Sequence, residues 1–260
     1  MPEILEVEQY RRLAATTLGR SVRDVDAPDA WYLKRGLDAS TLRAALVGRA
    51  FVADRRVGKL LLLDVGGGPT VGLRFGMTGA LFVDGQPAIA RLEYSADLAD
   101  PVWDRFAVRF DGGGSLVVRD PRRLGGVELE PDESRLGFDA MSLTLGQLRR
   151  ALTGSRAPLK ARLLDQSRVA GVGNLLADEM LWRAGIDPVR PAGSLDPAEQ
   201  RRLHRHVRAT LRELQARGGS HTGDLQSMRA RDGFCPRDGT PLERRTVGGR
   251  TTYSCPGHQR

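Results

Sequence analysis

The hydrophobic pattern changes from strand-like to helical near residue 130, and that change constrains the fold more than any other feature. Before it, from about residue 20, short β-prone runs alternate with turn clusters such as 66–69 and 111–114. The runs are 50–53, 59–65, 70–75, 80–83, 106–110 and 116–119. Several short strands at this spacing predict a β-sandwich or a barrel.

After the change, the apolar residues recur at helical spacing. We expect helices over 145–153, 158–165, 174–184 and 197–217, and one more over 3–18, ahead of the strands. The last of the later helices has clear end signals, because Asp196 caps it, Pro197 occupies its first turn and Gly218 follows it. The chain therefore divides into a strand-rich part and a helix-rich part.

The charge of the chain favours a polyanionic partner. The net charge is +8 and the isoelectric point about 10.2 over 260 residues, which points to nucleic acid first and otherwise to a merely basic soluble protein. No apolar run reaches the length of a membrane span and the sequence contains no charged-then-apolar signal segment, so we expect a cytoplasmic protein without a membrane partner.

The N-terminus carries the first candidate chemistry. An initiator Met before proline is normally removed, which leaves Pro2 with a free secondary amine. The reference pKa of an α-amino group is about 7.7–8.0, so this amine is partly neutral and nucleophilic near pH 7. If it attacks C1′ of a sugar, the resulting iminium is an electron sink for phosphate elimination, and Glu3 and Glu6 are placed to move protons. The alternative is an acidic start to a first helix.

Three further segments hold candidate site residues. Only three of the 40 basic residues are lysines, and Lys59 is one of them, at the start of an apolar strand. Met77 lies between two glycines on a tight turn, either as core packing or as a wedge between bases. Arg122, Arg123 and Leu124 follow a proline turn, where the arginines either clasp phosphate or base edges or are simply solvated.

The segment 164–174 ends in Gly-Val-Gly-Asn ahead of a predicted helix. Glycines there let the backbone approach a ligand, and a helix N-terminus offers N–H groups to a phosphate. No strand precedes the segment, so it is not a dinucleotide-binding fingerprint.

Both cysteines lie near the C-terminus and predict a metal site. Cys235 and Asp238 are three residues apart, and so are Cys255 and His258, with sixteen residues between the two pairs. Two ligand pairs joined by a hairpin are typical of a zinc ribbon, although aspartate is an unusual structural ligand. The alternative is a hairpin that packing alone holds.

In this order, the motifs resemble the bacterial formamidopyrimidine-DNA glycosylase / endonuclease VIII family of bifunctional base-excision enzymes. The resemblance runs nearly end to end. It implies an α+β fold, with an N-terminal two-sheet β-sandwich and N-terminal helix over 1–130, a linker over 131–140, a helical domain with a helix–two-turn–helix element over 141–225, and a β-hairpin finger over 226–260. It also implies a bacterial, nucleoid-associated monomer that binds damaged double-stranded DNA. Structural zinc is its implied cofactor, and none is needed for the chemistry.

The resemblance also implies roles for single residues. Pro2 is the Schiff-base nucleophile, Glu3 the proton carrier and Glu6 a supporting acid. Lys59 is implied in β-elimination and Arg250 in δ-elimination. The implied DNA contacts are Met77, Arg105, Arg122, Arg123, Leu124, Arg156, Lys160 and Asn174, with Glu179 as a supporting acid. Of these, Met77, Arg122 and Leu124 fill the gap that a flipped nucleotide leaves.

Four departures from the family pattern shape the expected specificity. Leu5 replaces a frequent second proline, Leu124 replaces a frequent phenylalanine, and Asp238 and His258 replace cysteines. The interval between Gly219 and Cys235 is shorter than in purine-directed members, where it forms a lid over 8-oxoguanine. We therefore expect removal of oxidised pyrimidines or abasic-type lesions, followed by β,δ-elimination. The alternatives are a purine-directed glycosylase and a relative that binds lesions without cutting.

Overall fold

The computed structural model describes residues 2–89 and 100–260, so Met1, whose removal we expect, lies outside them. The chain folds into two units. The first comprises Pro2 with Glu6–Glu133, and the second comprises Glu3–Leu5 with Ser134–Arg260. The finer boundaries at 130, 140 and 225 stay predictions. Within the described residues, no helix is both long enough and apolar enough to cross a membrane.

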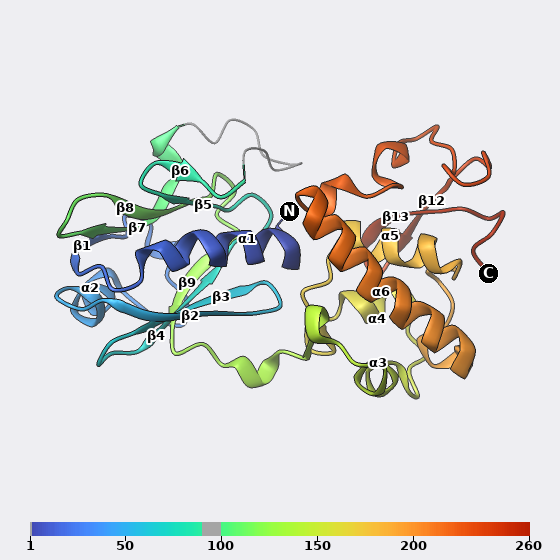
Figure 1. Ribbon diagram of the computed structural model, residues 1–260, viewed down its shortest axis with the longest axis horizontal. Helices are drawn as coiled ribbons and strands as arrows, with labels where there is room; N and C mark the ends of the chain where they lie inside the picture. The colour runs from blue at the N-terminus through green and yellow to red at the C-terminus, as the bar shows by residue number, and fades with distance from the viewer. Residues whose placement is uncertain (1, 90–99) are drawn as a thin grey trace. The chain divides into compact units, whose positions relative to one another are not determined.

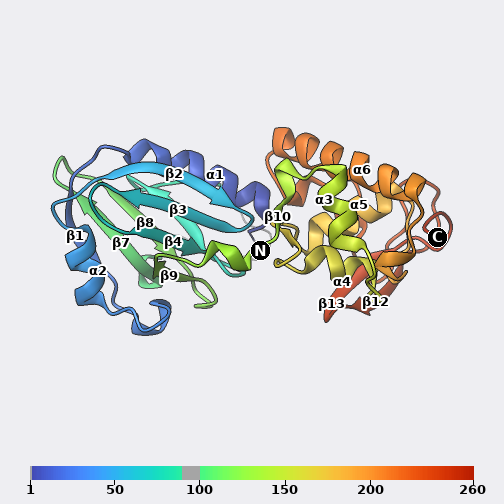
Figure 2. The same ribbon diagram turned by 90° about the horizontal axis from the view of Figure 1, so that it is seen from below.

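The first unit is a two-sheet sandwich of antiparallel strands (Figures 1 and 2). One sheet has the order β1 (Val22–Asp26), β7 (Asp104–Phe110), β8 (Ser115–Arg119), β5 (Ala80–Val83) and β6 (Gln86–Pro87). The other has the order β2 (Phe51–Val57), β3 (Leu60–Val65), β4 (Thr70–Arg74) and β9 (Gly126–Leu129). Side chains from both sheets form one apolar core, which α1 (Ile4–Ala14) and α2 (Ala39–Leu46) help to cover.

Every run that the sequence predicts as a strand is a strand, within a few residues at each end. Sequence reasoning missed β1, β9 and α2. In β1, three of five residues are charged, and a register shift at Val22 and Asp24 breaks the alternation. In α2, only Leu42 and Leu46 are buried, so the helix has a very narrow apolar stripe. Short edge elements of this kind carry too little periodicity to be recognised.

The second unit is helical, with α3 (Leu145–Leu152), α4 (Leu159–Leu164), α5 (Asn174–Ala184) and α6 (Pro197–Arg217) around one core. Two strands, β10 (Phe138–Asp139) and β11 (Val169–Ala170), pair in parallel. The C-terminal hairpin consists of β12 (Glu243–Val247) and β13 (Arg250–Ser254). The predicted bounds of α5 and α6 are those observed.

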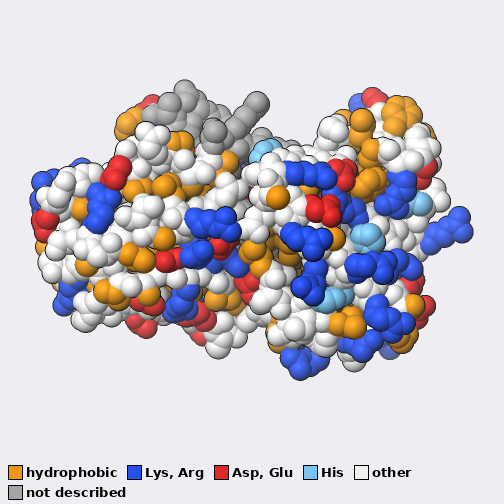
Figure 3. Space-filling model, in the orientation of Figure 1, with side chains coloured by type: hydrophobic (Ala, Val, Ile, Leu, Met, Phe, Trp, Pro, Cys, Tyr) orange, Lys and Arg blue, Asp and Glu red, His pale blue; other side chains and the backbone are white. Residues whose placement is uncertain are grey.

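The contacts at both ends of helix α6 explain why the sequence signals predicted its bounds correctly. Asp196 caps the backbone N–H groups of Ala198 and Glu199, Glu199 caps in return, and Gly218 ends the helix at φ 108°. Its apolar side is buried, and Figure 3 shows basic side chains gathered on the face of the second unit that carries this helix. Its arginines are Arg201, Arg202, Arg205, Arg208, Arg212 and Arg217.

The first helix belongs to both cores. Ile4 and Leu5, at its start, pack into the core of the second unit, whereas Val7, Tyr10 and Ala14 pack into the sandwich. The predicted helix over 3–18 is therefore confirmed over Ile4–Ala14, and its apolar face is imperfect because it serves two cores.

Candidate functional site

Glu3 is fully buried, and its carboxylate caps the start of α5. The two carboxylate oxygens accept hydrogen bonds from the backbone N–H groups of Gly173 at 2.8 Å, Leu175 at 2.8 Å and Leu176 at 3.2 Å. A helix N-terminus carries N–H groups without helical partners and a partial positive charge, so it favours a carboxylate. The second residue of the expected mature chain is thereby fixed to the helix that the sequence analysis singled out.

The glycines ahead of α5 make room for the N-terminal segment. A Cβ on Gly173 would lie 2.2 Å from the carboxyl carbon of Glu3, and one on Gly171, at φ 108°, would lie 2.4 Å from Ile4. We expected these glycines to admit a phosphate to the helix N-terminus. The group that approaches is instead the chain's own Glu3, so the phosphate interpretation is wrong for these three N–H groups.

Pro2 directly precedes these anchored residues and is itself buried. Besides the bonds to Glu3, the backbone N–H of Ile4 donates to the Gly171 carbonyl at 3.1 Å. Glu6 is 3% exposed on the first turn of α1. The two predicted acids are thus buried side chains, and the chain next to the predicted nucleophile has little conformational freedom.

Lys59 lies in the two-residue turn of the β2–β3 hairpin rather than at the start of a strand. Val57 pairs with Leu60, and Gly58 takes φ 59°, as the first position of such a turn requires. Leu60 in turn pairs with Arg74, the last residue of β4. The turn therefore lies at the end of the sheet from which the Met77 loop leaves.

A buried carboxylate, that of Asp120, joins two loops of the first unit. Its Oδ1 accepts hydrogen bonds from the Thr78 hydroxyl at 2.6 Å and from the Arg122 N–H at 3.2 Å, and its Oδ2 accepts one from the Gly125 N–H at 2.9 Å. A Cβ on Gly76 would lie 2.4 Å from the Leu124 backbone. Segments 75–79 and 120–125 are therefore packed together.

These joined loops present the predicted gap-filling residues. Leu124 is 52% exposed, Arg122 is exposed and Met77 is half-buried. A half-exposed leucine at the tip of a well-anchored loop is not explained by core packing. The structure thus brings together the three residues that the resemblance implies fill the gap left by a flipped nucleotide.

Two other arginines of this region have protein partners. Arg123 takes φ 56° and donates both of its bonds to the carboxylate of Asp29, at 2.6 and 2.7 Å. Arg105 donates to the carbonyl of Asp120 at 3.0 Å. In this structure both side chains brace the loop, and their predicted DNA contacts stay predictions.

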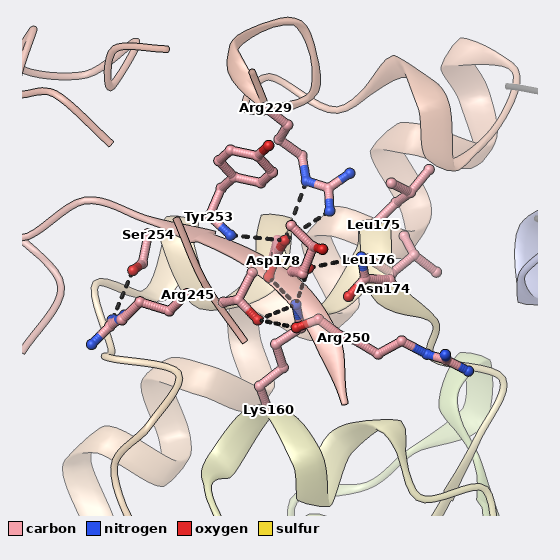
Figure 4. A network of polar contacts seen from close by, with 12 residues as sticks. Lys160, Asn174, Leu175, Leu176, Asp178, Arg229, Arg245, Arg250, Tyr253 and Ser254 are labelled. Carbon is pink, nitrogen blue, oxygen red and sulfur yellow. Dashed lines mark hydrogen bonds and ion pairs between the residues drawn. The ribbon is translucent and has the colours of Figure 1, made fainter. Parts of the chain in front are cut away.

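Arg250 and Asn174 are brought together in the second unit. Arg250 is exposed and opens β13, after a tight turn at Gly248 and Gly249, which both have positive φ. The side-chain Nδ2 of Asn174 donates to the carbonyl of Thr251 at 3.0 Å. The helix and the hairpin that carry two predicted site residues therefore meet there (Figure 4).

Lys160 is a correction to the sequence analysis, which placed it among the DNA contacts. Its side chain is fully buried, and its ammonium lies 2.7 Å from Oδ1 of Asp178. A direct contact with a surface ligand is therefore wrong for Lys160. Arg156, from the same stretch, is exposed.

Glu179 binds the segment that follows α6. Its carboxylate accepts hydrogen bonds from the Asp224 N–H at 3.1 Å, the Leu225 N–H at 2.9 Å and Arg183 at 2.6 Å. The expected supporting acid is therefore a buried anchor for segment 220–225.

The four predicted metal ligands converge. One donor atom from each of Cys235, Asp238, Cys255 and His258 lies within 4.8 Å of the others. Nδ1 of His258 is 3.7 Å from the Cys235 sulfur and 2.9 Å from Oδ2 of Asp238, which is 3.4 Å from the Cys255 sulfur. Two sulfurs, one imidazole and one carboxylate form a donor set that suits Zn²⁺.

The surroundings of this cluster support the same interpretation. Nε2 of His258 lies 3.1 Å from the Trp182 carbonyl, which leaves Nδ1 available for a cation. The indole N–H of Trp182 donates to the Cys235 sulfur at 3.3 Å. Hydrogen bonds from Thr240 hold the pKa of Asp238 well below its ordinary value, so its carboxylate is charged at neutral pH. The residues present therefore fit a zinc ion.

Sequence reasoning missed the two buried carboxylates that organise these loops. Asp120 directly precedes the proline and arginines of the 121–124 segment, but the sequence analysis assigned a function only to the arginines. Asp178 sits on a helix whose neighbours are buried apolar residues. A charged residue on such a helix is almost never fully buried unless it is paired, and this is the signal that was available.

Family models match the sequence of this chain, and solved structures match its fold. The model of the formamidopyrimidine-DNA glycosylase N-terminal domain matches residues 1–127, and that of the formamidopyrimidine-DNA glycosylase H2TH domain matches residues 136–225. A relative named formamidopyrimidine-DNA glycosylase in Thermus thermophilus is 36% identical, over 98% of this chain and 97% of the relative. One of the same name in Roseiflexus is 33% identical over the whole of both chains.

Two solved structures of DNA complexes have the same fold. The Lactococcus lactis Fpg with abasic-site DNA has a TM-score of 0.82 at 25% identity, over 99% of both chains. An LlFpg complex with THF-DNA and an inhibitor has a TM-score of 0.83 at 26% identity, over the whole of both chains.

Proposed function

Since this chain belongs to the formamidopyrimidine-DNA glycosylase family, a family of DNA glycosylases with AP lyase activity, we propose that it repairs DNA by removing oxidised bases through its own N-terminal proline. Damaged double-stranded DNA is the substrate. The observation that carries the proposal is the buried Glu3 carboxylate, which three backbone N–H groups fix directly beside Pro2.

The covalent step uses the imino nitrogen of Pro2. Its lone pair attacks C1′ of the damaged nucleotide, the glycosidic bond breaks, and the base leaves with a proton. The nitrogen then loses its proton, its lone pair expels O4′, which takes up a proton as the sugar ring opens, and C1′ and the nitrogen form an iminium. This iminium withdraws electrons from the sugar. Glu3 carries protons during base loss and ring opening, and its fixed position suits proton transfer, because a proton carrier must stay within hydrogen-bond reach.

Strand cutting then follows by β,δ-elimination. Loss of a C2′ proton expels the 3′ phosphate, and a second elimination expels the 5′ phosphate. Lys59, on its hairpin turn, serves the first elimination, and Arg250, at the start of β13, serves the second. Asn174 holds a phosphate beside the lesion, which fits its hydrogen bond to Thr251, the residue that follows Arg250.

Base removal requires the nucleotide to leave the stack. Extrusion costs a few kcal/mol, least for a weakened pair. Met77, Arg122 and Leu124 fill the vacated space, and Asp120 supports the loops that carry them.

The favoured lesion is an oxidised pyrimidine or an abasic-type site. A lid over a flipped purine needs a loop that is free to close. Segment 220–234 is short and is anchored at Asp224 and Leu225 through Glu179, and at Arg229 through Asp178. A segment held at these points is not free to close over a flipped base, which favours lesions that need no lid.

A purine-directed activity is the second candidate. The observation that favours it is the name formamidopyrimidine-DNA glycosylase, which the curated relatives share, together with an Lactococcus lactis Fpg structure with FAPY-dG DNA at 26% identity. If this chain removes oxidised purines, it recognises them without a lid formed by segment 220–234.

A lesion panel separates these candidates. End-labelled duplexes that carry dihydrouracil, 8-oxoguanine or an abasic site are cut side by side, and the product ends are analysed. We expect faster cutting at dihydrouracil than at 8-oxoguanine, with phosphate on both sides of a one-nucleotide gap. Faster cutting at 8-oxoguanine supports the second candidate. Tight binding without any cutting would identify a non-cleaving relative and contradict both.

We also propose that the cysteine cluster binds structural zinc. The donor set and the imidazole orientation support it. Metal analysis of the purified protein should find one zinc per chain, and Cys235→Ser should lower that content. A protein that folds and purifies without metal would contradict the proposal.

A further inference from the structure

A cluster of three charged side chains lies fully inside the second unit. Lys160 on α4 and Asp178 on α5 are 0% and 1% exposed, and their charged atoms lie 2.7 Å apart. Arg229, whose side chain is 6% exposed, reaches the same carboxylate from the segment after α6, at 3.0 Å. Figure 4 shows Asp178 between the two cations.

Lys160 and Asp178 depend on each other for their charges. Burial lowers the pKa of Lys160 and raises the pKa of Asp178, because the apolar surroundings disfavour either charge alone. Such clusters are costly to build, and a well-packed apolar set often stabilises a protein equally well. Stability alone is thus a weak explanation for a buried ion cluster at this place.

The cluster is bonded to the strand that begins with Arg250. The Lys160 ammonium donates to the Thr251 carbonyl at 3.1 Å and to the Thr252 hydroxyl at 2.8 Å. The Tyr253 N–H lies 3.3 Å from Oδ2 of Asp178. The three residues after Arg250 are therefore each in contact with the cluster.

The hairpin needs such outside support. A two-stranded ribbon is marginally stable by itself, and the tip of this one is two glycines. Helix α4 lies against the tip, since a Cβ on Gly248 would be 2.9 Å from Cβ of Ala161. The side chain of Arg250 extends away from the cluster (Figure 4), so the cluster acts on its backbone alone.

We propose that Lys160, Asp178 and Arg229 are positioning residues that hold the backbone after Arg250, and so aim its guanidinium at the phosphate that leaves in δ-elimination. This inference rests on the proposed function. Base removal and β-elimination use Pro2, Glu3 and Lys59, none of which lies on this strand. Loosening the strand should therefore slow δ-elimination selectively.

The test substitutes Thr252, which accepts from Lys160 and donates to the Arg250 carbonyl at 3.0 Å. Thr252→Val keeps the shape of the side chain and removes both bonds, and Thr252→Ser is the matched control that keeps them. Abasic duplex is cut under single-turnover conditions, and the ratio of δ to β product is measured together with borohydride trapping.

We expect Thr252→Val to lower the ratio of δ to β product by about tenfold, since small misplacements of a reacting group have such effects. Trapping should be unchanged and Thr252→Ser should restore the ratio. Lys160→Met, checked for folding by its melting curve, should lower the ratio in the same way. An unchanged ratio in a folded Thr252→Val protein would overturn the positioning role alone. A wild-type protein that stops after β-elimination would overturn both this role and the proposed second elimination.

Discussion

Asp120 in the first unit and Asp178 in the second are both buried carboxylates that support exposed candidate site residues, yet they do so with different partners. Asp120 receives hydrogen bonds from a hydroxyl and from backbone N–H groups. Asp178 is held by two cations, Lys160 and Arg229. The first arrangement braces one pair of loops, whereas the second joins two helices, a loop and a hairpin.

The two sets of partners differ in how much stability is lost when the central carboxylate is removed. When a buried carboxylate is removed, each neutral donor that loses its acceptor is left unsatisfied, and this costs the desolvation free energy of that donor. Two buried cations that lose their shared anion are left as uncompensated charges, which costs more. The Asp178 region should therefore tolerate change less than the Asp120 region, and four substitutions test this ranking.

The largest effect is expected for Asp178→Ala. Removing the anion leaves Lys160 and Arg229 buried and uncompensated, so the free energy of unfolding should fall by about 3–5 kcal/mol. Denaturant unfolding measures this free energy. Asp178→Asn is the control, because it removes the charge and keeps the shape of the side chain. A loss of less than about 1 kcal/mol would show that water or rearrangement relieves the two charges.

Asp120→Ala should have the next largest effect. The Thr78 hydroxyl and the N–H groups of Arg122 and Gly125 lose their acceptor, so unfolding should become easier by about 2–3 kcal/mol. Cutting of lesion DNA should fall as well, because the Leu124 loop loosens. If Asp120→Ala proves more costly than Asp178→Ala, the comparison is reversed.

A smaller effect is expected for Asp29→Asn, which removes the clasp on Arg123. Hydrogen bonds from Arg123 lower the pKa of Asp29 below its ordinary value of 3.8. The clasp therefore contributes stability above that pH and loses it as the pH falls further. Melting curves of both proteins should differ slightly at pH 7 and converge below pH 3.8. A difference that grows in acid contradicts this assignment.

The smallest effect on stability is expected for Leu124→Ala. Its side chain is 52% exposed, so the free energy of unfolding should change by less than about 0.5 kcal/mol. Cutting of a duplex with a paired lesion should nevertheless slow, and cutting of a single-stranded abasic site should not. Loss of stability without loss of cutting would make Leu124 a packing residue.

Sequence patterns predicted the elements whose signals are local. The cap at Asp196 and the glycine after Arg217 located α6 to the residue. Their spacing alone also singled out the four candidate metal ligands, which the fold brings within 4.8 Å of one another. Strand β1 and helix α2 were missed because their buried residues are few and irregular. The site was predicted as separate motifs, and their grouping comes from the fold.

Partners that lie far apart in the sequence were not predictable. Glu3 and Gly173 are separated by 170 positions, and nothing local marks Glu3 as the cap of α5. Lys160 was assigned to a DNA contact because the resemblance implied one, whereas its side chain is buried against an anion on another helix. Buried polar residues were thus where sequence reasoning failed, since their environment is set by tertiary contacts.

The central claim is that the imino nitrogen of Pro2 bonds to the sugar. Borohydride reduction of the protein with abasic duplex, followed by mass mapping of the adduct, tests it most directly. We expect the adduct on Pro2 in protein without its initiator Met, and none in a protein that carries one extra residue before Pro2 and melts at the same temperature. An equally strong adduct in the extended protein, or an adduct mapped to Lys59, would contradict the account.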